Sequence, residues 1–88
     1  MLEIVLRGQF KKDYKLMEKR NFDMTELESI MFELASPNVL PPKNRDHALL
    51  GEYMGYRECH IAYDWLLIYK VVGDQIFFAR TGSHSDLF

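Results

Sequence analysis

The sequence predicts an α+β fold in which an N-terminal strand and a two-helix hairpin precede a small antiparallel sheet, with both helices packed on one face of it. Three observations indicate this fold: a β-branched run before the first glycine, two stretches with apolar residues at helical spacing, and a final third that reads as three consecutive strands. The chain has 88 residues, of which 48% are hydrophobic and 27% are charged. This is typical of one soluble globular domain, which we expect to span residues 1–88.

The first quarter of the chain is expected to form a strand and a helix. Residues 2–6 (LEIVL) are rich in β-branched side chains and form the strand. From residue 9 to residue 20, Phe10, Tyr14 and Met17 recur at spacings of four and three, which places them on one helical face. Lysines occupy most of the other side. We interpret them as a solvated face, with a contact to RNA or the ribosome as the alternative.

A second helix is predicted to begin near Asp23. Asp23 is suited to be the N-cap, and Glu26 three residues later suits a capping box. The helix should bury an apolar stripe made of Leu27, Ile30, Met31 and Leu34. It should end at the Ser-Pro-Asn sequence of residues 36–38, and the Pro-Pro pair at 41–42 makes an extended connection that cannot continue it.

Three strands are predicted at residues 56–61, 65–72 and 75–80, the last two joined by a tight turn at Gly73-Asp74. In the first of them, alternation puts His60 on the same face as Tyr56 and Glu58. In the last, Ile76, Phe78 and Arg80 share a face if no bulge intervenes.

Composition excludes several classes of protein. The net charge is −2 with neutral histidines, and this is not the basic balance of a protein that holds nucleic acid unaided. The longest apolar run, Trp65–Tyr69, is far shorter than the roughly 20 residues of a membrane-spanning helix. Nothing reads as a signal peptide, and the single cysteine, Cys59, excludes a disulfide framework and a cysteine-rich zinc site. We therefore expect a cytoplasmic protein with no membrane association.

Polar residues of catalytic type gather at the ends of the predicted strands: His47, His60, Asp64, Arg80 and His84. They have no metal-ligand spacing, and no phosphate-binding glycine motif accompanies them. Imidazoles with a carboxylate and a guanidinium suit metal-free RNA cleavage, in which a base activates the ribose 2′-OH, a cation stabilises the phosphate and an acid protonates the 5′-oxygen. Taken singly, each histidine is more often a surface residue, Arg80 an ion-pair residue, and Trp65 or Phe88 a packing residue.

The second half of the chain resembles the YafQ branch of the RelE/ParE toxin superfamily. The resemblance rests on four segments in the family's order and spacing: DH-x-L-x-G, GYR-x-x-H, DW-x-L-I-Y-K and R-T-G-S-H-x-x-L-F. It implies a RelE-like fold and a bacterial type II toxin without a cofactor, an endoribonuclease that cuts messenger RNA in the ribosomal A site. It also implies a cognate antitoxin protein as partner, with promoter DNA contacted only through that antitoxin.

The resemblance implies roles for the residues of the site. His47, His60 and Asp64 would supply the base and orient the 2′-OH. Arg80 would stabilise the transition state, and His84 would be the general acid. Further contacts to the nucleotide are expected from Phe88 at the end of the chain and from Trp65, Lys43 and Arg45; Trp65 would otherwise only pack the site.

One feature departs from the family. YafQ-like toxins are usually basic, whereas this chain is slightly acidic, which fits an enzyme whose substrate is presented by the ribosome. Two other functions stay open from the sequence. One is a ParE-like toxin that binds a topoisomerase, although that branch has no need of acid–base residues. The other is an inactive protein of the same fold that only binds its antitoxin.

Overall fold

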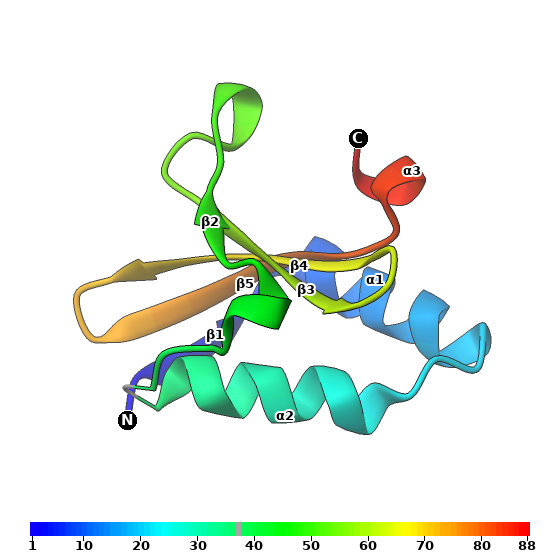
Figure 1. Ribbon diagram of the computed structural model, residues 1–88, viewed down its shortest axis with the longest axis horizontal. Helices are drawn as coiled ribbons and strands as arrows, with labels where there is room; N and C mark the ends of the chain where they lie inside the picture. Colours follow the sequence, from blue (N-terminus) through cyan, green and yellow to red (C-terminus); the bar gives the residue numbers. More distant parts are fainter. Residues whose placement is uncertain (37) are drawn as a thin grey trace.

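The computed structural model describes residues 1–36 and 38–88 and contains one five-stranded sheet with helices on both of its faces (Figure 1). The strands lie in the order β1-β5-β4-β3-β2. In chain order the elements are β1 (Glu3–Leu6), α1 (Gly8–Lys19), α2 (Met24–Ala35), the short 3-10 helix η1 (Pro42–Asn44), β2 (His47–Ala48), a second 3-10 helix η2 (Gly51–Tyr53), β3 (Arg57–Ala62), β4 (Trp65–Val72), β5 (Gln75–Gly82) and α3 (His84–Leu87). The predicted α+β class is confirmed.

The sheet is antiparallel except at one edge. β2, β3, β4 and β5 pair antiparallel in sequence, whereas β1 pairs parallel to β5. The chain leaves β1 through both long helices and returns across the sheet, and a long crossover of this kind is what a parallel neighbour requires. The N-terminal strand therefore closes one edge of the predicted meander, and the two-residue strand β2 closes the other.

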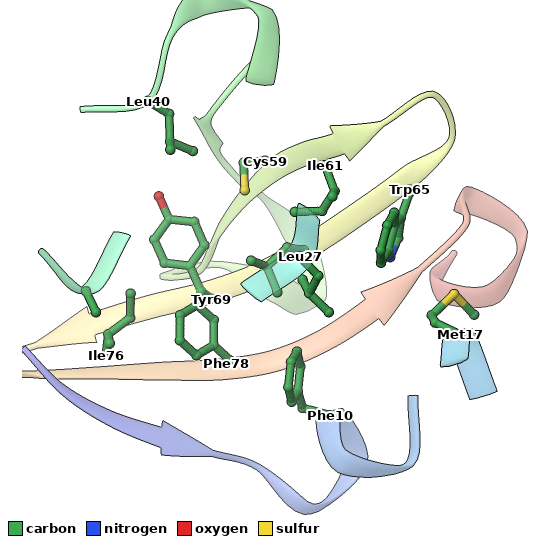
Figure 2. Packing of buried hydrophobic residues seen from close by; sticks show 12 residues of the cluster. Phe10, Met17, Leu27, Leu40, Cys59, Ile61, Trp65, Tyr69, Ile76 and Phe78 are labelled. Carbon is green, nitrogen blue, oxygen red and sulfur yellow. The ribbon is translucent and has the colours of Figure 1, made fainter. Parts of the chain in front are cut away.

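The helices α1 and α2 cover one face of the sheet and enclose the main core. In Figure 1 they run in opposite directions, with α2 below the sheet. Figure 2 shows the buried layer between them and the strands, in which Phe10 and Met17 of α1 and Leu27 of α2 lie with Phe78 of β5. Phe10 and Phe78 are in ring contact, with centroids 5.9 Å apart. The apolar stripes predicted for both helices thus bury against the sheet.

A smaller apolar cluster lies on the opposite face. Leu66 and Ile68 of β4 form its buried centre with Leu87 of α3. Tyr53, the last residue of η2, and Tyr56, just before β3, pack at its side. Figure 1 shows α3 and this loop rising from the sheet on the side away from α2. The helix α3 and the loop that contains η2 thus border the face of the sheet on which the catalytic-type residues lie.

The helix ends agree with the predicted boundaries to within a residue or two. Asp23 caps α2 and accepts from the backbone N–H of Thr25 at 3.1 Å. The capping box expected there with Glu26 is found at α3, where the Ser83 side chain and the Asp86 side chain bond reciprocally to each other's backbone N–H. The α2 helix ends at Ala35, and Pro37, the proline of the predicted stop, lies outside the described residues.

A bulge changes the face on which Arg80 lies. Tyr69 pairs with Phe78 but the preceding Ile68 pairs with Arg80, so Ala79 is the extra residue in β5. Phe78 is buried on the helix side, whereas Ala79 packs with the cluster on the opposite face. The alternation that would have put Arg80 with Ile76 and Phe78 is therefore interrupted. Arg80 takes its place in a row across the sheet with Ile68 and Glu58.

Among the described helices, none has the length and apolar character to cross a membrane.

Candidate active site

His84 is held at the start of α3 by a carboxylate from a neighbouring turn. Asp64 Oδ1 accepts from the His84 backbone N–H at 3.0 Å and lies 2.8 Å from its ring Nδ1. These hydrogen bonds, the backbone one first, hold the pKa of Asp64 below its usual value. An ionised carboxylate only accepts, so Nδ1 carries the proton and Nε2 faces away from Asp64. The carboxylate therefore fixes the orientation and the tautomer of the ring.

The backbone around His84 and Asp64 allows the neighbouring segments to approach each other closely. Asp64 has φ 52° in the β3–β4 turn, a left-handed conformation that aspartate tolerates better than most residues. At Gly82 an added Cβ would come within 3.0 Å of the Asp86 Cβ, so a side chain there would push α3 away. Arg20 at the end of α1 donates to Asp86 at 2.9 Å and anchors α3 from the helix side. Together with its own N-cap contacts, this ion pair holds the pKa of Asp86 down to about 2.

A second group joins two histidines through a buried glutamate. Glu58 is only 4% exposed, and its Oε1 lies 3.6 Å from His47 Nε2 and 3.8 Å from His60 Nε2. His47 comes from the edge strand β2, and the register places it directly opposite Glu58 on β3. His60 follows Glu58 by two residues on the same strand and face, as the alternation predicted.

A backbone carbonyl fixes the orientation of the His47 ring. Its Nδ1 lies 2.7 Å from the backbone carbonyl oxygen of Arg45, and a carbonyl oxygen only accepts, so Nδ1 carries a proton. The Nε2 atom, on the other side of the ring, is directed toward Glu58 Oε1. His47 is therefore held between Arg45 and Glu58, with Nε2 on the side of the glutamate.

His60 is partly buried, and its surroundings shift its pKa. Burial lowers the pKa of His60, with Arg45, His84 and His47 adding to the effect and Glu58 opposing it. Its ring is 6.0 Å from the His84 ring, measured between centroids. The two rings, Asp64, Arg45 and Tyr63 line a pocket of about 200 Å³. Two imidazoles in different settings therefore face one pocket, one with a lowered pKa and one bonded to a carboxylate, an arrangement that suits a general base and a general acid.

Arg80 is held by a buried aspartate of α1. Its Nε donates to Asp13 Oδ2 at 2.7 Å and its Nη2 to Asp13 Oδ1 at 3.3 Å. Asp13 is only 6% exposed and also accepts from the backbone N–H of Thr81. The Asp13 hydrogen bond raises the pKa of Arg80, with a contribution from the Tyr53 hydroxyl. The guanidinium is thus a fixed cation on the row that also carries Ile68, Glu58 and His47.

The other predicted site residues differ in their exposure and in how close they lie to the pocket. Phe88 is 64% exposed and lies beside His84, with ring centroids 6.5 Å apart. Arg45 lines the pocket, and Lys43 lies one turn away in η1. Trp65 is 2% exposed and packs edge-on against Phe22 in the helix-side core, as Figure 2 shows for its position in the buried layer. Trp65 therefore packs beneath the site, the second of its two expected roles, and does not reach a bound nucleotide.

Two residues of the site were missed from the sequence. Glu58 carried a signal, because the alternation in β3 already put it on the face of His60 and Tyr56. No sequence pattern pointed to Asp13, because it lies in a lysine-rich helix and its partner Arg80 is 67 residues away in the sequence. Asp64 lines the same pocket as His60, and its hydrogen bonds go to His84. Within the described part of the chain, no three His, Cys, Asp or Glu side chains lie close enough to hold a metal ion.

A small five-stranded sheet with a helix pair on one face and acid–base residues on the other is the architecture of the RelE-like toxins. Within that class, a family model described as the bacterial toxin of type II toxin–antitoxin systems, YafQ, matches residues 2–88. The chain belongs to this YafQ family. It is 42% identical over 87 residues to the mRNA interferase toxin YafQ of Escherichia coli K12, covering 98% of this chain and 95% of that protein.

Solved structures agree over the whole chain. A copper-bound mutant toxin from Helicobacter pylori superposes with a TM-score of 0.94 at 39% identity, covering 100% of both chains. YafQ in the E. coli DinJ–YafQ complex superposes with a TM-score of 0.91 at 42% identity, covering 100% of this chain and 99% of that one. The fold predicted from the sequence resemblance is therefore confirmed.

Proposed function

We propose that this protein is the toxin of a type II system and an endoribonuclease that cuts messenger RNA on the ribosome. The observation that carries the proposal is that two imidazoles in different surroundings face one pocket. The His84 ring is bonded to Asp64 at 2.8 Å, and the ring of His60, whose pKa is lowered, lies 6.0 Å from the His84 ring between centroids. Relatives named mRNA interferase toxin support the same activity.

In the proposed reaction the ribose 2′-oxygen attacks the adjacent phosphorus and the bond to the 5′-oxygen breaks. His60 accepts the 2′-OH proton. In this reaction the Nε2 atom, which lies 3.8 Å from Glu58 Oε1, would carry the proton, and Nδ1 would hold the accepting lone pair. His84 donates its Nε2 proton to the departing 5′-oxygen, while Asp64 stabilises the ring in its charged form. The products are a 2′,3′-cyclic phosphate and a 5′-hydroxyl, and the two histidines end with their protonation states exchanged.

Two cations would stabilise the phosphate as charge develops on its oxygens. Arg80 presents a guanidinium held by Asp13, so little reorganisation is needed when the substrate binds. His47, whose Nε2 lies 3.6 Å from Glu58 Oε1, would supply the second charge in its protonated form. Arg45 lines this pocket, Lys43 lines the neighbouring one and Phe88 lies beside His84, so these three residues would contact the flanking nucleotide.

The partners follow from the same assignment. We propose a cognate antitoxin, in keeping with the DinJ–YafQ complex of E. coli, and regulation at promoter DNA only through that antitoxin. We propose that the ribosome presents the message, because a chain of net charge −2 has little attraction for free RNA. An antitoxin segment that covers part of the cluster between His47 and His84 would block the pocket.

The test is to induce the protein and map the 5′ ends of cellular transcripts, and then to repeat the cleavage with purified ribosomes. New 5′-hydroxyl ends in phase with codons are expected. Because the steps above use only side chains, cleavage by purified protein should continue with a chelator selective for transition metals over magnesium.

Three outcomes would contradict the proposal. DNA damage with intact transcripts would favour the ParE-like function, and growth arrest without either effect would favour a protein that acts only by binding. Activity that is lost in chelator and restored by a single transition metal would contradict the metal-free mechanism, and copper is the first metal to try, given the copper-bound relative.

Glu58→Gln tests the assignment of His60 as the base. Glu58 opposes the lowering of the His60 pKa, so its removal should lower that pKa further. Activity falls at acid pH when the base becomes protonated, and the acidic limb of the kcat/KM profile should therefore move to lower pH. The rate on the plateau should also fall, because His47 and His60 both lose the carboxylate beside their Nε2 atoms. Glu26→Gln, an exposed position on α2, is the matched control and should leave the profile in place. A limb that moves to higher pH, or not at all, would exclude His60 as the base.

A further inference from the structure

A continuous row of aromatic and cationic side chains leads away from the active site across the open face of the sheet. It starts at Phe88, whose ring is 5.7 Å from Tyr53, and Tyr53 is 6.1 Å from Tyr56. The Lys70 ammonium lies 4.8 Å from the centre of the Tyr56 ring and 5.9 Å from that of Phe77. The Arg7 guanidinium lies 5.7 Å from the Phe77 ring and ends the row. We call Tyr53, Tyr56, Lys70, Phe77 and Arg7 the aromatic–cation row.

The strand register makes this row a property of the sheet. Lys70 of β4 pairs with Phe77 of β5, and Phe77 pairs with Val5 of β1. Phe77 alternates with Ile76 and Phe78, which are buried under the helices, so its ring is on the opposite face. The row therefore crosses β4 and β5 on the face that carries His60 and His84. Along β4 it lies two residues from Ile68, which is in the row of Arg80 and Glu58.

The two cations of the row are free to meet an anion. In the described structure the arginine ion pairs involve Arg20, Arg57 and Arg80, each with an aspartate, whereas Lys70 and Arg7 contact rings and no carboxylate. A ring face attracts the cation without neutralising it and limits the rotamers of an otherwise flexible side chain. Lys70 and Arg7 are thus positioned in advance, which lowers the entropic cost of binding a phosphate.

From these contacts we propose that the aromatic–cation row binds the single-stranded message on the 3′ side of the cut, with Lys70 and Arg7 on its phosphates and the tyrosines against its bases. This inference rests on the proposed function. The direction follows from the chemistry, because the row joins the site at Phe88 beside His84, the acid for the leaving 5′-oxygen. That oxygen belongs to the nucleotide downstream of the cut. Aromatic side chains and unpaired cations are the groups that proteins use for single-stranded RNA.

The test is a binding measurement, so it does not depend on turnover. The affinity of Lys70→Gln for ribosomes is compared with that of the unmodified chain, both in a His84→Gln background that prevents cleavage. The ribosomes carry a message that extends past the A-site codon. We expect about 3–10-fold weaker binding for Lys70→Gln, and a dependence of log K on log salt that is shallower by about 0.7, the value for one single-strand phosphate. In the active background, KM should rise with kcat unchanged. Lys70→Arg should restore both.

Two arms separate the message from other sources of phosphate. On a message that ends at the A-site codon, the penalty of Lys70→Gln should disappear. If the same penalty remains there, or on ribosomes without a message, the row contacts ribosomal RNA and the proposal is overturned. Lys12→Gln removes an equal charge from an exposed position of α1, on the opposite face, and should have no effect. An equal loss from Lys12→Gln would mean that binding follows net charge and would overturn the proposal too. Cleavage by the unmodified chain without any Lys70 effect would reject the row and leave the proposed function intact.

Discussion

We expect His84→Gln to lose about 10²–10⁴ in cleavage rate, the usual contribution of a general acid, and to lose growth arrest with it. The 5′-alkoxide is a poor leaving group, so its protonation should matter more than it would for an activated substrate. The His84 side chain is more than half exposed, and within residues 1–36 and 38–88 its ring hydrogen-bonds to Asp64 alone. The substitution should therefore leave the fold, antitoxin binding and ribosome binding unchanged. Single-turnover cleavage on programmed ribosomes gives the rate, and thermal unfolding checks the fold.

A substrate with a better leaving group separates acid catalysis from other roles of His84. A 5′-thio linkage at the cut site departs as a thiolate, which needs little protonation. His84→Gln should cut it much faster than the natural linkage, whereas the unmodified chain should cut both. If the variant gains nothing from the thio linkage, His84 is not the acid, and the role passes to His47 or His60. Asp64→Asn should show the same rescue in weaker form, because Asp64 acts through the His84 ring.

The elements predicted correctly are those whose signal is local. The helical spacing of Phe10, Tyr14 and Met17, the N-cap at Asp23 and the turn at Gly73-Asp74 depend on neighbours a few residues away, and each is present in the structure. The elements that were missed are short or depend on distant contacts. The four-residue helix α3 is stable because Arg20 and Leu66 lie against it, and neither is near it in sequence.

The same division applies to the active site. His60 and Glu58 could be placed on one face, because alternation in a strand is regular. Their partners could not be placed, because a bulge and an edge strand decide them: β2 brings His47 to Glu58, and the bulge at Ala79 turns Arg80 away from Phe78. A bulge adds one residue and leaves no mark in hydrophobic periodicity. Alternation therefore gave the face of each residue only as far as the first irregularity in its strand.

Arg80→Ala is the second large effect that we expect, at about 10²–10³ in rate, the usual result of removing a preorganised charge from a developing oxyanion. The structure adds a consequence for stability. Asp13 is buried and loses its cation in this variant, although it keeps the hydrogen bonds from the backbone N–H of Thr81 and the side-chain amide of Gln9. A buried charge left short of partners costs on the order of 1–3 kcal/mol of unfolding free energy. A loss of activity in Arg80→Ala alone would therefore mix a catalytic effect with a folding effect.

A double variant separates the two effects. In Asp13→Asn/Arg80→Gln both charges are removed together, so the fold should recover most of the stability that Arg80→Ala loses, while the rate should stay about 10²–10³ down because no cation faces the phosphate. Arg80→Lys should restore only part of the rate, because an ammonium cannot hold both oxygens of Asp13 and present a planar donor to the substrate. Chemical denaturation and single-turnover cleavage, measured on the same samples, decide the matter. If the double variant recovers activity along with stability, Arg80 serves only to neutralise Asp13, and the charge that stabilises the phosphate must come from His47.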